Sequence, residues 1–173
     1  MGFSIGEYSV LSEFSPDTKR RFRLECRWDR DNPKRYVWIM LNPSIAGSGN
    51  TPDDLDPTLR RVRGFTQRDK RAGGFVVFNL FSIVSTDPKA LEDQPREPDP
   101  IDQTCIAEAA TGGENVLRTI AAWGANRHVT ERTDLFRRRA MFYRTEVHCL
   151  GKTKAQHPKH PLYLPSATPW ERF

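Results

Sequence analysis

Four stretches of the chain are apolar almost throughout, and each is about the length of a strand: residues 37–41, 75–81, 116–123 and 146–150. Continuous apolar runs of this length are typical of strands buried on both faces, as in a parallel sheet covered by helices. The first run stops at Asn42, and Pro43 follows. Because proline cannot donate to a strand ladder and holds the residue before it extended, this strand should present Asn42 at its carboxyl end.

Amphipathic segments separate the apolar runs and predict helices. Asp56 followed by Pro57, and Asp99 followed by Pro100, each combine a helix-capping side chain with a proline at the first helical position. Thr130 or Thr133 can cap a third helix. Strands that alternate with helices predict an α/β protein, here a three-layer α/β/α sandwich with a central parallel four-stranded sheet.

The first 35 residues follow a different pattern, because apolar and charged positions alternate from Arg21 to Trp28. This period of two predicts an antiparallel hairpin at the edge of the sheet, with no chemical role. We therefore predict one α/β domain over residues 1–173, with the hairpin at 1–35, the parallel core at 36–151 and a tail at 152–173. The tail should cross the carboxyl ends of the parallel strands.

Composition narrows the classes of protein. The mean hydropathy is −0.66, no apolar run is long enough to span a membrane, and residues 1–10 do not resemble a signal peptide. A cytoplasmic location and no membrane partner are expected. Three widely spaced cysteines, Cys26, Cys105 and Cys149, indicate buried thiols. We expect no metal and no cofactor; the sequence does not indicate an oligomeric state.

The balance of 27 Lys+Arg against 22 Asp+Glu gives a net charge of +5, which favours a polyanionic partner. Nucleic acid, with DNA as the expected form, or a nucleotide fits this charge. Clustered basic residues near the expected strand ends are candidates for contact with the phosphate backbone, although each cluster is also compatible with ordinary solvated surface. These candidates are Arg60, Arg61, Arg138, Lys152, Lys154 and Lys159.

Polar residues at the ends of the apolar runs are the candidate site. Asn79 interrupts the second run, and a buried amide without a partner costs roughly 1 to 3 kcal/mol. It must therefore bond to backbone or face a ligand. His157 and His160 lie in the basic tail, where an imidazole could act near neutral pH.

Combined motifs along the chain resemble a bacterial and phage family catalogued as a domain of unknown function, number sixteen forty-three. The resemblance covers about residues 36–165. The motifs are Leu-Asn-Pro-Ser at 41–44, Asp-Pro-Thr at 56–58, Asn-Leu-Phe at 79–81, Thr-Asp-Pro at 86–88, Ala-Trp-Gly at 122–124, Leu-Gly-Lys-Thr at 150–153 and His-Pro-Leu-Tyr-Leu at 160–164.

A more remote resemblance is to the uracil-DNA glycosylase superfamily, which places four short motifs in the same order. Here their counterparts are Asn42-Pro43, Asn79, Trp123-Gly124 and His160-Pro161. The resemblance implies that Asn42 orients a water, that Asn79 pairs with the base edge and that His160 donates to the leaving base. It also implies a DNA glycosylase-like enzyme that hydrolyses the N-glycosidic bond of a damaged or modified base.

Several alternatives stay open at this point. Asp54 or Asp56 could serve as the base, although Asp56 also suits helix capping. Ser44 and Trp123 are further candidate contacts to the substrate, whereas Phe81 and Tyr163 could each stack on a base or belong to the core. A non-catalytic nucleic-acid or nucleotide binding module, and a hydrolase of free nucleosides or nucleotides, are the rival functions.

Overall fold

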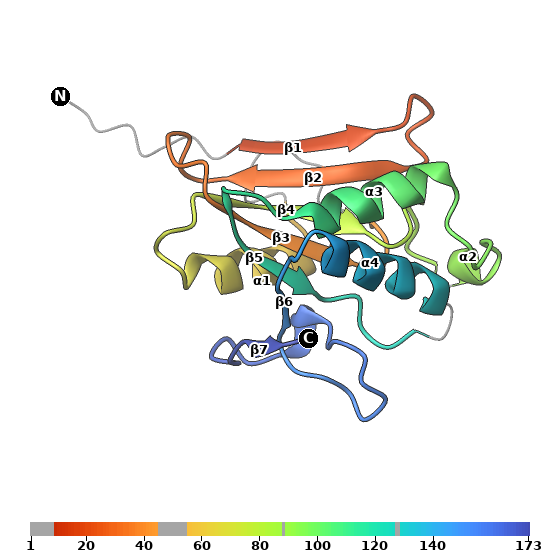
Figure 1. The fold of residues 1–173 in the computed structure, drawn as a ribbon. Coiled ribbons are helices and arrows are strands. Elements are labelled where there is room, and N and C mark those ends of the chain that lie inside the picture. The colour runs from red at the N-terminus through yellow and green to blue at the C-terminus, as the bar shows by residue number, and fades with distance from the viewer. Residues whose placement is uncertain (1–8, 45–54, 88, 127–128) are drawn as a thin grey trace.

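The computed structural model describes residues 9–44, 55–87, 89–126 and 129–173. They form a seven-stranded sheet with the strand order β1-β2-β4-β3-β5-β6-β7 and helices packed against it (Figure 1). The predicted α/β class is confirmed. No helix among these residues is long and apolar enough to cross a membrane, and the same residues contain no group of three or more side chains suited to hold a metal ion.

Four strands in the middle of the sheet run parallel. Strand β3 (Arg35–Met40) lies between β4 (Gly74–Asn79) and β5 (Val116–Ala121), and β6 (Val147–Cys149) pairs with β5. Every residue of β4 is buried, as the apolar run predicts. Met40 is in register with Asn79, so β3 and β4 end together and their following loops start from the same edge.

Antiparallel strands flank this parallel group. The hairpin of β1 (Ser9–Phe14) and β2 (Arg21–Arg27) pairs with β4 through β2, as predicted for one edge. At the other edge, β7 (Glu171–Arg172) pairs with β6. The sequence pattern did not predict β7, because two exposed charged residues carry no strand periodicity.

Helices cover both faces of the sheet and give it two cores. Helix α1 (Pro57–Gln67) packs on the face that carries Trp38, whereas α3 (Pro100–Thr111) and α4 (Thr130–Phe142) lie side by side on the face that carries Ile39. A short helix α2 (Lys89–Glu92) and a 3-10 helix η2 (Pro161–Tyr163) complete the described elements.

The predicted helix caps are correct at two of the three helices. The carboxylate of Asp56 accepts a bond from the Leu59 amide at 2.7 Å, and Asp99 accepts one from the Asp102 amide at 2.9 Å. The prediction for α4 is wrong: Thr130 is its first residue, Val129 stands at the cap position without a side-chain bond, and Thr133 donates to the Thr130 carbonyl.

The three cysteines are buried and free, which confirms the predicted thiols. Burial raises the pKa of Cys26 to about 11, that of Cys105 to about 12 and that of Cys149 to about 11. They are therefore neutral, unreactive thiols at physiological pH.

Candidate functional site

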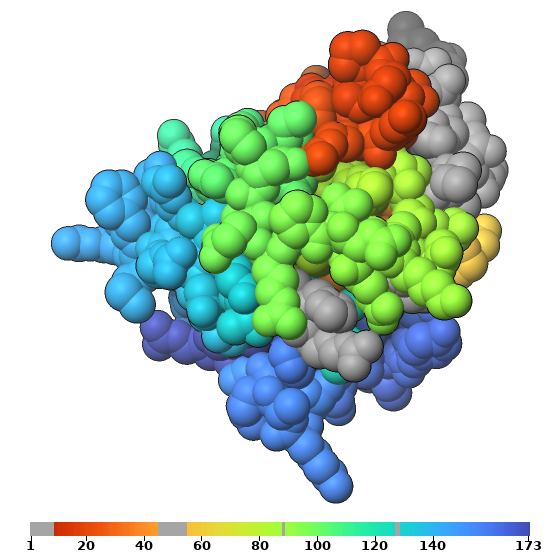
Figure 2. All heavy atoms as spheres, turned by 90° about the vertical axis from the view of Figure 1, so that its right-hand side faces the viewer, coloured from red at the N-terminus to blue at the C-terminus, as the bar shows by residue number. Residues whose placement is uncertain are grey.

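A cavity of about 340 Å³ lies where β3 and β4 end, beside the first turn of α1. Figure 2 views the molecule from the end toward which β4 points in Figure 1; the green segment after β4 and the blue segment after β6 both reach this face. The cavity brings together residues far apart in the sequence. Its polar lining includes Arg21, Asn42, Ser44, Asp56, Asn79, Trp123 and His160.

Asn42 follows β3 and is held in one orientation. Its amide nitrogen donates to the carbonyl oxygen of Ser85 at 2.8 Å and to that of Pro43 at 3.2 Å. Because both partners are acceptors, the NH₂ group must face them. The carbonyl oxygen Oδ1 is then the atom that the Asn42 side chain can offer to a water or ligand.

Asn79 is the last residue of β4 and is 2% exposed. It lies on the same face as Val77, which also lines the cavity. Its amide nitrogen has no hydrogen-bond partner among the residues that the structure describes. Such a group costs free energy unless a ligand or water accepts from it. No backbone carbonyl of the described residues therefore accepts from this nitrogen, and a ligand or water that accepts from it could enter through the cavity.

His160 caps η2 and has a defined tautomer. Its Nδ1 accepts a bond from the Leu162 amide at 3.3 Å, so the proton of the neutral ring resides on Nε2. Burial lowers the pKa of His160 below its ordinary value, and the negative charge of Asp56 opposes this shift only in part. The ring is therefore a neutral Nε2–H donor at physiological pH.

Asp56 has structural partners for both carboxylate oxygens. Oδ1 accepts from the Leu59 amide, and Oδ2 accepts from the Ser44 hydroxyl at 2.8 Å. This bond links the loop after β3 to the start of α1 and brings Ser44 to the cavity. The capping role predicted for Asp56 is confirmed, while Asp54 lies outside the described residues.

Substitution of Asp56 separates capping from acid-base chemistry. Asparagine also caps helices well, so the free energy of unfolding of D56N should lie within about 0.5 kcal/mol of the wild-type value. That of D56A should be lower by about 1 kcal/mol. Urea unfolding measures both. If Asp56 acted as the base of a reaction in this cavity, D56N would slow that reaction as much as D56A despite its retained stability. A purely capping Asp56 would leave the rate of such a reaction nearly unchanged in D56N, which is the result we expect.

Trp123 and Gly124 follow β5 and border His160. Trp123 is 2% exposed, packs edge-on against Phe136 and Phe173, and lines the cavity. Its indole nitrogen also lacks a partner within the described part of the chain. Gly124 has φ +76°, and a Cβ there would lie 3.4 Å from the His160 Cβ. Glycine therefore suits both the backbone and the close approach of the His160 loop.

The two candidate stacking aromatics have opposite environments. Phe81 is 1% exposed, lies in the core beneath α3 and α4, and does not line the cavity. The Arg132 guanidinium covers its ring at 3.9 Å. Of the two alternatives for Phe81, stacking on a base or packing in the core, this placement fits the core. Tyr163 is 86% exposed on η2, three residues beyond His160, and is free to contact a large ligand.

Of the residues predicted to contact the phosphate backbone of a nucleic acid, some already have partners within the protein. Arg61 donates to the Leu164 carbonyl and, at 2.9 Å, to the Ser166 hydroxyl, so it holds the C-terminal tail in place. The Nζ atom of Lys152 forms an ion pair with Oε1 of Glu171 at 3.9 Å. The remaining candidates are exposed: Arg60, Arg138, Lys154 and Lys159.

Arg21 is a cavity residue that the sequence pattern placed on the opposite face. The pairing of β1 with β2 shifts between Glu13 and Phe14, so that Phe14 pairs with Arg21 and Glu13 with Arg23. The extra residue, Phe22, packs on the core of α3 and α4, whereas Leu24 packs on the α1 side. This bulge reverses the alternation and turns Arg21 toward the cavity. The hairpin, which the sequence predicts to have no chemical role, thus contributes one side chain to the lining of the cavity.

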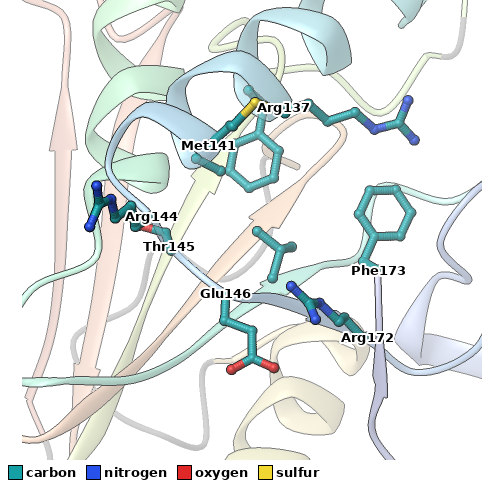
Figure 3. A pocket seen from close by; sticks show the side chains of 10 residues that line it. Arg137, Met141, Arg144, Thr145, Glu146, Arg172 and Phe173 are labelled. Carbon is teal, nitrogen blue, oxygen red and sulfur yellow. The ribbon is translucent and has the colours of Figure 1, made fainter.

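A larger hollow of about 610 Å³ lies elsewhere, between α4 and β7 (Figure 3). Figure 3 shows Arg137 from α4, Arg172 from β7, Phe173 directly after β7, and Arg144 and Glu146 from the segment before β6. Arg137 stacks 5.0 Å from the centre of the Phe173 ring. Its arginines are exposed to solvent, so it lacks the buried, unpaired groups that mark the smaller cavity.

The molecule is thus an α/β protein with a polar cavity at the carboxyl ends of its parallel strands. The chain belongs to the family described as Protein of unknown function (DUF1643), whose sequence profile matches residues 21–162. Neither a search of curated proteins nor a search of solved structures found a match. The first predicted resemblance is confirmed; the resemblance to uracil-DNA glycosylases stays a prediction.

Proposed function

We propose that this protein hydrolyses the N-glycosidic bond of a damaged or modified base in nucleic acid, with DNA as the expected form. The observation that carries the proposal is the buried Asn79 amide nitrogen at the cavity, which lacks a partner in the described part of the chain. A base edge with an acceptor atom would satisfy it. The cavity volume of about 340 Å³ supports a ligand of one ring system, because pockets for small molecules span about 300 to 1,000 Å³.

The orientation of the side chains supports this chemistry. In the proposed reaction the bond between the anomeric carbon and the base nitrogen breaks, and its electron pair leaves with the base. The Nε2–H of His160 donates to the negative charge that develops there. Asn42 Oδ1 orients the water whose oxygen adds to the anomeric carbon. One hydrogen of this water stays on the new hydroxyl, and the other neutralises the departing base.

Tyr163 and the exposed basic residues support a polymeric substrate. A base must leave its duplex stack to reach the cavity, at a cost of a few kcal/mol. Stacking on an exposed aromatic such as Tyr163 can return about 1 to 3 kcal/mol per base. Lys154 and Lys159 lie in the same tail as His160 and are available for phosphate contact.

The experiment is base release from oligonucleotides that carry a panel of modified bases, followed by detection of abasic sites. Wild-type protein should release at least one base. N79L should lower the rate of base release about 10²-fold, because the acceptor on the base edge then has no donor in the cavity. N79L should not lower stability, since the amide nitrogen it removes is unpaired. Wild-type binding without release would support the non-catalytic module instead.

A hydrolase of free nucleotides is the second candidate. The buried guanidinium of Arg21 in the same cavity favours it, because a mononucleotide can bring an anionic group inside. Release of base from mononucleotides, with none from oligonucleotides, would select this candidate.

A further inference from the structure

Arg21 is a buried cation without a direct partner for much of its guanidinium. The residue is 3% exposed, and its Nε and Nη1 atoms have no hydrogen-bond partner within residues 9–44, 55–87, 89–126 and 129–173. Burial lowers the pKa of Arg21 to about 10, so the group stays charged at physiological pH. An unpaired buried charge is among the costliest arrangements in a folded protein.

The negative charge that acts on this cation does not contact it. The carboxylate of Asp56 acts on Arg21 through space, and no ion pair or hydrogen bond joins the two side chains in the described part of the chain, where the Asp56 oxygens accept from the Leu59 amide and the Ser44 hydroxyl. Arg132 provides the contrast. It is 1% exposed and equally buried, yet it forms an ion pair with Asp102 and donates to the carbonyls of Leu80 and Pro95.

The bulge at Phe22 explains how the cation comes to face the cavity. With regular alternation, Arg21 would lie opposite to Leu24, on the face of α3 and α4. The register shift between Glu13 and Phe14 turns it instead to the α1 side, where Asn79 and His160 also line the cavity. All three residues present donors, so the cavity is matched to a ligand rich in acceptors.

We propose that Arg21 is an anion-binding residue of this cavity, and that the substrate carries an anionic oxygen group which accepts hydrogen bonds from its guanidinium. This inference rests on the proposed function in taking the cavity as the substrate site. The anionic oxygen can come from a phosphate or from the deprotonated oxo edge of a ring. Planar pairing of a guanidinium with two oxygens suits either source.

Titration with small probes tests the proposal and distinguishes the two sources. Inorganic phosphate and ribose 5-phosphate represent the phosphate, barbiturate represents the anionic oxo ring, and ribose is the neutral control. Wild-type protein should bind at least one anion by calorimetry. R21M should bind that anion at least tenfold more weakly, while R23M, altered on the same strand at an arginine paired with Glu13, should bind as wild type does.

Thermal melting shows whether Arg21 serves binding or structure. Without ligand, R21M should melt at the wild-type temperature or a few degrees higher, because it replaces an unpaired buried cation by an apolar chain of similar length. A lower melting temperature for R21M would overturn the proposal, as would equal anion binding by R21M and wild type. Failure of every anion to bind wild type would overturn it too.

Anion binding does not depend on catalysis, so the two proposals fail separately. Anion binding lost in R21M, together with no base release from any oligonucleotide or nucleotide, would leave Arg21 as an anion-binding residue and remove the hydrolase. Base release that R21M retains in full, with no anion bound by wild type, would keep the hydrolase and remove the anion site.

Discussion

Replacing His160 by alanine should slow base release by about 10² to 10³-fold, which is the usual cost of removing one preorganised donor to developing negative charge. The Leu162 amide holds Nδ1, so Nε2–H is the donating atom. The substitution removes this donor and leaves in place Asn79, the residue proposed to pair with the base. We therefore expect the loss in kcat, measured by single-turnover release of the base, and little change in substrate affinity.

His157 provides the matched control, because it lies in the same tail and does not line the cavity. H157A should release base at the wild-type rate. An H160A protein that turns over as fast as wild type, with its melting temperature unchanged, would exclude His160 from the reaction.

Replacing Arg132 by methionine should lower the free energy of unfolding by roughly 3 to 5 kcal/mol, because it leaves the buried carboxylate of Asp102 without its ion-pair partner. The substitution also frees the carbonyls of Leu80 and Pro95. For a chain of 173 residues, the melting temperature should fall by roughly 6 to 20 °C. Calorimetry or urea unfolding measures this effect.

R138M is the control on the same helix, since Arg138 is exposed, and it should change stability by less than about 0.5 kcal/mol. The double variant R132M/D102L should regain part of the loss, because a buried pair can be replaced by apolar groups at little cost. Equal stability of R132M and R138M would contradict the role assigned to the ion pair. A further drop in the free energy of unfolding of R132M/D102L below that of R132M, by roughly another 3 kcal/mol, would also contradict this role.

Much of the fold could be predicted from the sequence because the parallel strands are buried on both faces. Residues 75–81 are apolar apart from Asn79, and β4 is buried along its whole length. The aspartate-proline pairs also mark two helix starts correctly. Strand β7 was missed because its pairing with β6 is a tertiary contact that leaves no periodicity in Glu171 and Arg172.

The candidate site could be predicted only where it depends on strand ends. Asn42 and Asn79 follow directly from where two parallel strands stop, because the carboxyl ends of such strands share one edge. Arg21 could not be found in this way. One extra residue in β2 reverses which face each side chain takes, and the alternating sequence itself gives no sign of the bulge.

Basic residues that already have hydrogen-bond partners within the protein illustrate a second limit: sequence patterns do not show which cations are free to bind a ligand. Arg61 lies within a cluster that resembles a phosphate-binding surface, yet residues 164–166 return to it and take its hydrogen bonds. Arg68, on the same side of the molecule, donates to Ser166 and Thr168. Contacts across about a hundred positions of the chain decide which cations stay free.

The bond between Asn42 and the Ser85 carbonyl has a consequence for how this family can vary. It ties the loop after β3 to the segment after β4, so residues 80–85 act as a spacer of fixed length between two site asparagines. Insertions in this spacer should be rare among natural relatives and harmful in engineered variants, whereas the exposed chain around Lys154 and Gln156 should accept changes in length.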